Sequence, residues 1–514
     1  MPYKKEQFVI LKRDLSKEID VDDSAGRSVP INMNFVETGF LTKDTGSTLF
    51  GATETLKAHS LFNYKKKDGT SYQIRVLGTK LQKYNSTSGL WEDTTKTVTA
   101  DKEFGYIVYD DILYCSNTAE MPFTWDGTTF TDVAAIPKGN ILEVFEDRLF
   151  VSGVPAEPLT IYYSNVGDFT TFSGTSLVKP LGTDKVTHLE NYYGQLLIFK
   201  RDTIWKLTFQ YDQITSLYIP KIELQSGNYG ATSKNAVTWV ENDIWFFTGR
   251  EVRAIGFKDQ QTGVLGVNAS VISDNIKETL FTMSITEQEK AVVFYHNRKF
   301  YLSVPIIGKE NDTVFVCHLL YKNNWTKYSN RIKASISDFM VIDDVIYTTK
   351  SVAPYGVLKW DSSIYDDNGV AVNSEVFFKK IEDKDFNKFN IYRYLDLMFK
   401  NLQGKIKVTI KQDANDLRSE KTKTFFIGQG LEDELGSLGE TDVGEVLVAD
   451  SFGQSIESAP FLKNRISFLS KAQTLTIGLS SSNAGETFTI AEFALYGTKE
   501  PRKEFAPKKI ISVN

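Results

Sequence analysis

The sequence predicts an all-β protein in which a β-propeller of about seven blades is followed by a C-terminal β-sandwich, with an extended arm at each end. Three observations lead to this prediction. A unit of two apolar runs joined by a short polar turn recurs from about residue 58 to residue 365 of the 514 residues. Aromatic residues, which favour strands, make up 13% of the chain. A second group of strand-like runs follows a turn cluster at residues 366–369.

The recurring unit is clearest between residues 142 and 172. Its two apolar runs meet at a turn formed by Glu146 and Asp147, which is a hairpin signal. A residue near the start of the second run marks each unit, and successive markers are 38, 37, 47, 48, 56 and 46 residues apart. A four-stranded blade needs about 40–50 residues. The markers are Ile74, Ile112, Leu149, Leu196, Ile244, Phe300 and Ile346.

Radial stacking explains why such repetition is favourable. A four-stranded sheet has two apolar faces, and each face is buried when the next blade packs against it. Tryptophans near the blade ends, such as Trp125 and Trp360, suit this packing better than a ligand-binding role. We place the propeller at residues 58–365, with a helical insertion at about 268–290. There Ser273 can cap a helix that carries Ile276 and Leu280 on one face.

Residues 370–498 predict the sandwich, because several alternating runs occur there with little helical signal. The stretch 428–450 is acidic and rich in glycine, and we expect a loop. Residues 1–57 and 499–514 predict extended arms, and the first arm is expected to pack on the next domain or on a neighbouring subunit. The strand-like runs are 392–399, 406–410, 423–427, 465–469, 475–479 and 488–496.

The composition does not favour electrostatic binding of the whole protein to nucleic acid or to an anionic membrane, since 59 basic and 65 acidic residues leave a net charge of -6. The N-terminus lacks a secretory apolar core, and no apolar run approaches the ~20 residues that span a bilayer. We therefore expect a protein made in a cytoplasm and soluble there. Cys115 and Cys317 lie in apolar runs and are predicted to be buried thiols.

No local motif predicts catalytic, cofactor-binding or metal-binding residues. The four histidines, at positions 59, 188, 296 and 318, lack metal-ligand spacing, and adjacent Cys317 and His318 point to opposite faces of a strand. Hydrolase and phosphate-loop motifs do not occur. The segment Thr42 to Leu49 only imperfectly matches a sialidase box and lies outside the repeats. Asp312 and Asp343-Asp344 could bind a cation, but the sequence has no calcium-loop spacing.

Paired acids occur at Asp110-Asp111, Glu146-Asp147 and Asp343-Asp344. Glycoside hydrolysis needs two carboxylates that face each other across a sugar. These pairs instead occupy repeated turns, where Asp is favoured for its local hydrogen bonds. Turn chemistry is therefore the better interpretation.

Several segments resemble the β-propeller tail proteins of tailed bacteriophages. In that family an Arg-Leu-Phe strand precedes a segment with Tyr-Tyr-Ser, Gly-Asp and Phe, as residues 148–150 and 161–169 do here. The order Asn117, Pro122, Trp125-Asp126-Gly127-Thr128 is similar to another blade of the family, as are residues 272–276 and 301–305. The resemblance covers residues 30 to 365 and rests on motifs that form the fold.

The resemblance implies a structural virion protein of the nozzle or tail-hub type in short-tailed phages. Such proteins form a ring, typically sixfold, below the portal and adaptor, and DNA passes through the ring. The implied partners are other copies of the chain, the portal or adaptor, further tail proteins including fibres, and DNA without sequence-specific contacts. The implied location is the virion tail, with no stable membrane insertion, and no catalytic residue is implied.

Two other functions remain open from the sequence. A receptor-binding or glycan-binding propeller would stack exposed aromatic side chains on sugars, and glycan-array binding would identify it. A glycan-degrading tail enzyme would lose its activity when one of the paired acids is substituted.

Overall fold

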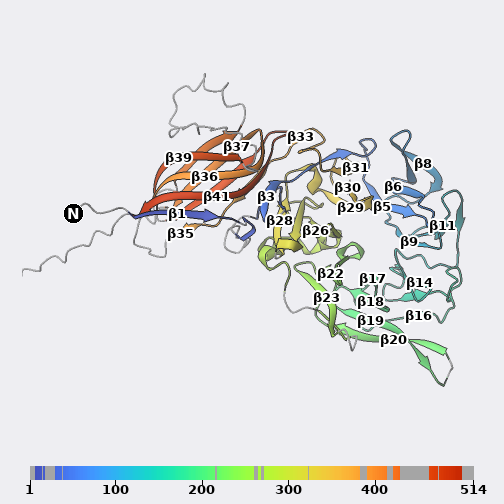
Figure 1. Ribbon diagram of the computed structural model, residues 1–514. Helices are drawn as coiled ribbons and strands as arrows, with labels where there is room; N and C mark the ends of the chain where they lie inside the picture. The colour runs from blue at the N-terminus through green and yellow to red at the C-terminus, as the bar shows by residue number, and fades with distance from the viewer. Residues whose placement is uncertain are drawn as a thin grey trace, which may run out of the picture. The chain divides into compact units, whose positions relative to one another are not determined.

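The computed structural model describes residues 6–13, 15–17, 29–36, 39–214, 217–259, 264–267, 271–321, 323–382, 390–413, 421–428, 462–472 and 474–499. The chain forms two compact units. One contains Asp22–Gly26 and Thr45–Asn368, and the other combines Met1–Val21 and Arg27–Asp44 with Gly369–Asn514. Figure 1 shows strands throughout both units. In the described ranges, no helix is long and apolar enough to cross a membrane.

The first unit is a seven-bladed β-propeller. Blades 1 to 6 are four-stranded antiparallel sheets whose strands follow one another in chain order. The first three blades contain β5 (Ala58–Lys65), β6 (Ser71–Leu77), β7 (Lys80–Asn85) and β8 (Leu90–Thr97); β9 (Gly105–Tyr109), β10 (Ile112–Ser116), β11 (Phe123–Trp125) and β12 (Phe130–Asp132); and β13 (Ile141–Phe145), β14 (Arg148–Ser152), β15 (Ile161–Tyr163) and β16 (Leu177–Val178).

The next three blades follow the same order. They contain β17 (Val186–Tyr192), β18 (Gln195–Lys200), β19 (Ile204–Asp212) and β20 (Leu217–Ser226); β21 (Val237–Val240), β22 (Asp243–Phe247), β23 (Val252–Asp259) and β24 (Val264–Val267); and β25 (Val292–His296), β26 (Lys299–Val304), β27 (Thr313–His318) and β28 (Asn324–Tyr328). Every sequence marker lies in the second strand of its blade, so the predicted seven-blade propeller is confirmed.

Blade 7 is completed by a strand from the N-terminal side of the propeller. It contains β29 (Ile336–Ile342), β30 (Val345–Lys350) and β31 (Val357–Asp361), and its fourth strand is β4 (Gly46–Leu49), antiparallel to β31. The short β32 (Asp366–Asp367) pairs with β4 in parallel. First strands of neighbouring blades contact one another, with Tyr192 of β17 stacked on Trp239 of β21 between blades 4 and 5, and β29 of blade 7 contacts β5 of blade 1. The ring of blades is therefore closed.

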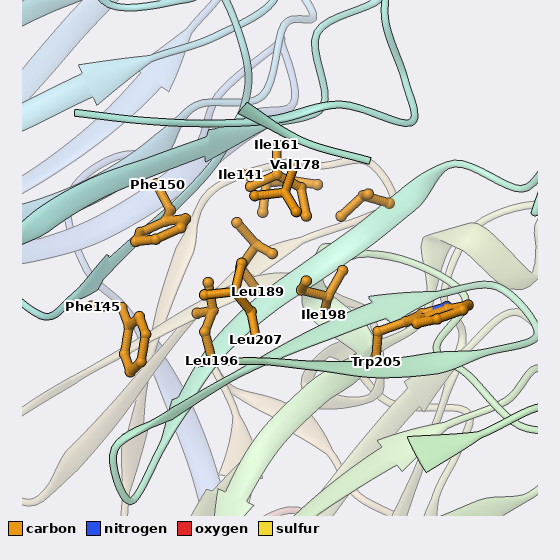
Figure 2. Packing of buried hydrophobic residues seen from close by; sticks show 11 residues of the cluster. Ile141, Phe145, Phe150, Ile161, Val178, Leu189, Leu196, Ile198, Trp205 and Leu207 are labelled. Atoms are coloured by element: carbon orange, nitrogen blue, oxygen red, sulfur yellow. The ribbon is translucent and has the colours of Figure 1, made fainter. Parts of the chain in front are cut away.

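Buried apolar clusters lie between adjacent blades, as radial stacking requires. Figure 2 shows one cluster in which Phe150 and Ile161 of blade 3 pack with Leu196 and Leu207 of blade 4. Another joins Leu61 and Trp91 of blade 1 to residues of blade 7 across the ring closure. Further clusters join blades 1 and 2, 2 and 3, and 6 and 7.

The helical insertion between blades 5 and 6 is shorter than we predicted. It consists of the 3₁₀ turn η4 (Asp274–Ile276), the five-residue helix α1 (Lys277–Phe281) and the 3₁₀ turn η5 (Ile285–Lys290). Ile276 and Leu280 are both buried. The predicted N-cap was wrong, because the Ser273 hydroxyl accepts a hydrogen bond from the Val252 amide at 2.8 Å and makes no cap.

The second unit is a β-sandwich of two sheets. One sheet has the order β2 (Met33–Val36), β3 (Phe40–Lys43), β41 (Thr487–Lys499), β36 (Asn390–Gln403) and β39 (Leu462–Ala472), and β1 (Glu6–Lys12) also pairs with β41. The other has the order β34 (Ser374–Phe377), β40 (Thr474–Ser481), β37 (Lys405–Asp413) and β38 (Lys421–Gly428), with β35 (Ile381–Glu382) paired to β40. Alternate residues of β37 and β40 are buried, and all six predicted runs are strands.

The range 1–57, which we predicted as an extended arm, contributes strands to both units. Its described residues include β1, β2 and β3 of the sandwich and β4 of the propeller. The short strand β33 (Val370–Ala371) follows the unit boundary, which lies in the predicted turn cluster. The predicted acidic loop at 428–450 and the arm at 499–514 lie outside the described residues, apart from their first residues, which end β38 and β41.

Candidate functional site

The paired acids occupy the turns between the first and second strands of their blades. Asp110 and Asp111 have φ values of 48° and 59°, and Asp343 and Asp344 have values of 46° and 66°. Two successive residues with positive φ are the mark of the two-residue hairpin turn in which Asp and Asn are favoured. The backbone confirms that turn chemistry explains these pairs, as it does for Glu146 and Asp147.

Each of several turns is also held by an aromatic side chain from the preceding blade. The Tyr64 hydroxyl donates to the Asp111 carbonyl, and the Tyr192 hydroxyl donates to the Asn242 carbonyl at 2.9 Å. His296 Nε2 lies 3.1 Å from the carbonyl oxygen of Asp344. These bonds tie one blade to the next at the end of the propeller where the turns lie.

Lys234 crosses the propeller axis. It belongs to the 3₁₀ turn η3 (Lys234–Ala236) directly before blade 5, and its Nζ donates to the Phe104 carbonyl of blade 2 at 2.8 Å. In a ring of seven blades, blades 2 and 5 lie on opposite sides, so this bond spans the centre. Lys234 also lies 3.3 Å from a Glu103 carboxylate oxygen, and its charge is the main cause of the lowered pKa of Glu103.

Two glutamates from neighbouring first strands approach each other near the axis. Burial, followed by the charge of Glu190 in β17, raises the pKa of Glu143 in β13 to about 8. Glu190 accepts a hydrogen bond from Trp239 Nε1 at 2.8 Å, and His188 Nε2 lies 3.0 Å from its other oxygen. A carboxyl group with a raised pKa beside a second carboxylate can transfer protons. Sequence reasoning missed this pair, because 47 residues separate the two glutamates.

A further acid with a raised pKa, the partly buried Asp338, lies at the joint between blades 7 and 1. Burial raises the pKa of Asp338 in β29 to about 6, although its carboxylate accepts the Leu61 amide of β5 at 2.7 Å. Asp312, the cation candidate, instead accepts the backbone amides of Ile306, Ile307 and Gly308 at 2.7–3.1 Å. Its role is to shape that loop.

The histidines and cysteines do not form a metal site. Where the chain is described, no three His, Cys, Asp or Glu side chains gather in a way that could hold an ion. His318 Nε2 lies 3.0 Å from the Thr326 hydroxyl and does not pair with Cys317 as a chelate. Both cysteines are free and buried, as predicted, and burial raises the pKa of each thiol.

An exposed apolar hairpin projects from blade 4. Strands β19 and β20 continue beyond the last residue paired to β18, Leu207, and the hairpin extends outward in Figure 1. Tyr211 and Tyr218 form a cross-strand pair and are 55% and 65% exposed. At the tip, Ile214 is 94% exposed and Leu217 is 63% exposed. We call residues 208–220 the blade-4 hairpin.

The residues that resemble phage tail proteins build the blades. Phe169 is buried and stacks on Tyr109 of blade 2, with ring centroids 4.1 Å apart. The Asn117 side chain accepts the backbone amides of Ala119 and Glu120 at 2.9 and 2.8 Å. Trp125 is 2% exposed. These positions agree with our interpretation of the motifs as fold-forming.

Comparisons with known proteins add little to this description. No protein-family model matches the chain, and no match is found among curated proteins. One solved structure with some similarity is titled "YCF48 bound to D1 peptide". It shares 8% sequence identity over 65% of this chain and 98% of that chain, with a TM-score of 0.38. A likeness of this degree carries no argument about function.

Proposed function

We propose that this chain is a structural protein of a bacteriophage tail, whose copies form a ring below the portal and adaptor. The observation that carries the proposal is the blade-4 hairpin, a single short element that gathers several apolar side chains that are more than half exposed: Tyr211, Ile214, Leu217 and Tyr218. Exposed apolar groups of this kind mark protein interfaces. The phage context is supported by the motif resemblance at residues 148–169 and 114–128.

The propeller axis is not the path for DNA in this proposal. Lys234 spans it from blade 5 to blade 2, and the partly buried Glu143 and Glu190 come from neighbouring first strands. A DNA duplex therefore has to pass through a channel that several copies enclose together. Each propeller is a wall segment of such a ring, and its closed blades supply rigidity.

The turn end of the propeller carries exposed carboxylates, including those of Glu146, Asp147, Asp343 and Asp344, whereas the Asp110 carboxylate pairs with Lys67 Nζ at 2.7 Å. Negative charge on a surface that faces DNA repels phosphates and prevents non-specific binding. A net charge of -6 has the same sign. This supports a protein past which DNA moves and to which it does not adhere.

The oligomeric state tests the proposal. Purified protein, alone and with the portal and adaptor, is passed through size-exclusion chromatography with light scattering and then viewed in negative stain. We expect a ring with a mass several times the 58.1 kDa of one chain. A monomer at every concentration that also fails to join the neighbouring tail proteins would contradict the proposal.

A further inference from the structure

A bulge in the innermost strand of blade 1 ties that blade to both of its neighbours. The pairing of β5 with β6 shifts after His59, and Ser60 has a φ of 56°. The Ser60 hydroxyl accepts the Phe104 amide of blade 2 at 2.9 Å, and the following amide, that of Leu61, donates to Asp338 of blade 7 at 2.7 Å. Positive φ is uncommon in residues other than glycine, and bulges re-aim side chains at functional positions. The strained backbone at Ser60 thus serves two contacts between blades.

Two titratable side chains lie at this bulge, and neither forms an ion pair in the part of the chain that the structure describes. The partly buried Asp338 accepts the Leu61 and Phe339 amides at 2.7 and 2.8 Å. His59 is only 9% exposed, with Nδ1 3.0 Å from the Ser60 hydroxyl and no hydrogen-bond partner for Nε2. A charge on either side chain is therefore held away from water without a direct counter-ion, which costs free energy.

The two groups respond to protons in opposite ways. Burial disfavours the carboxylate and raises the pKa of Asp338 to about 6. Burial also lowers the pKa of His59, and this effect outweighs the charges of Glu103 and Asp101, which raise it. A fall in pH therefore removes a charge from Asp338 and adds one to His59.

The groups around the bulge leave this opposition in place. The charge of Lys234 lowers the pKa of both Asp338 and His59, while the charge of Glu103 raises both. Tyr106 of β9 stays neutral, because burial raises its pKa well above the ordinary value. Other charged groups on or beside the strands packed here have partners: Lys57 with Glu310, Arg75 with Glu54, His296 with Asp344, and Lys350 with the Pro354 carbonyl.

We propose that the β5 bulge is a proton-responsive joint in the closed ring of blades. When Asp338 is ionised, the contact of Leu61 between blades 7 and 1 holds a poorly solvated charge, and the joint opens more readily. When His59 is charged, an unpartnered N–H is buried beside the Ser60 contact between blades 1 and 2, with the same result. The joint is tightest when both side chains are neutral.

The expected effects have opposite signs. The raised pKa of Asp338 contributes stability that is present below the unfolded value of about 3.9 and is lost as the pH rises through about 6. Opening should therefore become about tenfold more frequent from pH 5 to pH 7 through this group alone. The lowered pKa of His59 costs stability as the pH falls below its unfolded value of about 6.5.

Hydrogen exchange followed by mass spectrometry measures this opening. The readout is the protection of peptides that contain the Leu61 amide, corrected for the intrinsic exchange rate at each pH and compared with a peptide of β18 in blade 4. In His59→Gln only Asp338 is left to respond, and protection should fall about tenfold from pH 5 to pH 7. In Asp338→Asn only His59 is left, and protection should rise over the same range. The wild type should lie between the two variants.

Asp126→Asn is the matched control. Asp126 also accepts backbone amides, but its hydrogen bonds from Thr129 and Thr128 lower its pKa to about 2, outside the tested range. Its exchange profile should match the wild type. The same pH dependence in His59→Gln and Asp338→Asn, or protection in His59→Gln that does not change with pH, would overturn the inference.

A measurement on the wild type covers the case in which a variant fails to fold. With carbon-13 in the aspartate carboxyl groups, infrared spectra separate these groups from the glutamates. An aspartate band of a protonated carboxyl group should disappear as the pH rises from 5 to 7. If no aspartate titrates in this range, Asp338 does not take up the proton and the inference fails.

Discussion

Arg331→Met tests whether the buried ion pair at the ring closure holds blade 7 together. Arg331 and Asp367 are each 1% exposed and form two hydrogen bonds, at 2.8 and 2.9 Å. Asp367 also accepts the Ser47 hydroxyl of β4 at 2.9 Å, and Arg331 donates to the Thr45 carbonyl at 2.9 Å. The pair therefore joins the closing strand β4 to the blade that it completes.

The size of the effect follows from what the substitution leaves behind. Removal of one partner of a buried pair costs about 3–5 kcal/mol, because the other charge stays buried without compensation. Ser47 and the Lys333 amide, 3.2 Å from Asp367, remain as donors. We therefore expect the free energy of propeller unfolding to fall by about 3 kcal/mol, at the low end of that range.

Tryptophan fluorescence during guanidinium unfolding measures this loss, because all seven tryptophans lie between residues 91 and 360. Lys67→Met in the propeller is the control. The side chains of Lys67 and its partner Asp110 are 72% and 77% exposed, so the loss should be smaller. A loss below about 1 kcal/mol for Arg331→Met, within the range of exposed pairs, would refute the reasoning.

The pH dependence gives an independent check on the same pair. Burial alone would raise the pKa of Asp367, but the hydrogen bond and charge of Arg331, with the charge of Lys333, outweigh burial and lower it. A lowered pKa contributes stability above the unfolded value of about 3.9, and this is lost as the pH falls through the folded value. In the variant, the charge and hydrogen bonds of Arg331 no longer oppose the effect of burial on Asp367. Burial then favours the neutral form of the Asp367 carboxyl group. The stability difference between wild type and variant should therefore narrow from pH 7 toward pH 4.

Two further predictions use the same unfolding measurement. Gly46→Ala in β4 should destabilise the propeller by about 1–3 kcal/mol or more, because its Cβ would lie 1.7 Å from the backbone oxygen of Asp366. Gly174→Ala should change stability by less than about 0.5 kcal/mol, because no atom lies within 4 Å of the added Cβ. Equal losses of stability in Gly46→Ala and Gly174→Ala would contradict the argument. Burial raises the folded pKa of Glu143 to about 8, so the stability that it contributes is present at low pH and lost as the pH rises through that value. In Glu143→Gln, the free energy of unfolding should fall less between pH 5 and pH 9 than it does in the wild type. If the variant and the wild type lose stability equally over this range, Glu143 is not the source of the pH dependence.

The blades were predictable because their signal is local. A hairpin turn such as Asp343-Asp344 and the runs on either side of it fall within about ten residues, so periodicity and turn chemistry act together. The same is true of the sandwich runs, where alternation in Ile406, Val408 and Ile410 matches one buried face.

The candidate site depends on long-range neighbours and was largely hidden. Glu143 and Glu190 each lie in a run that looked like an ordinary strand, and only the packing of blade 3 on blade 4 brings their charges together. Lys234 likewise gave no signal, because its partner Phe104 is 130 residues away. The failed cap at Ser273 has a similar cause, since the amide of Val252 uses the hydroxyl.

The N-terminal segment shows why closure could not be foreseen and why it matters. β4 has the sequence Gly-Ser-Thr-Leu, which carries no strong strand pattern, and its partner β31 lies more than 300 residues later. Without β4, the edge of β31 would be open and the contacts of Asp367 with Ser47 would be lost. β2 and β3 occupy an equivalent place in the sandwich, where β3 pairs with β41. The propeller has its full set of strands only when β4 pairs with β31, and the sandwich only when β3 pairs with β41, so the integrity of both units depends on residues that precede the first blade.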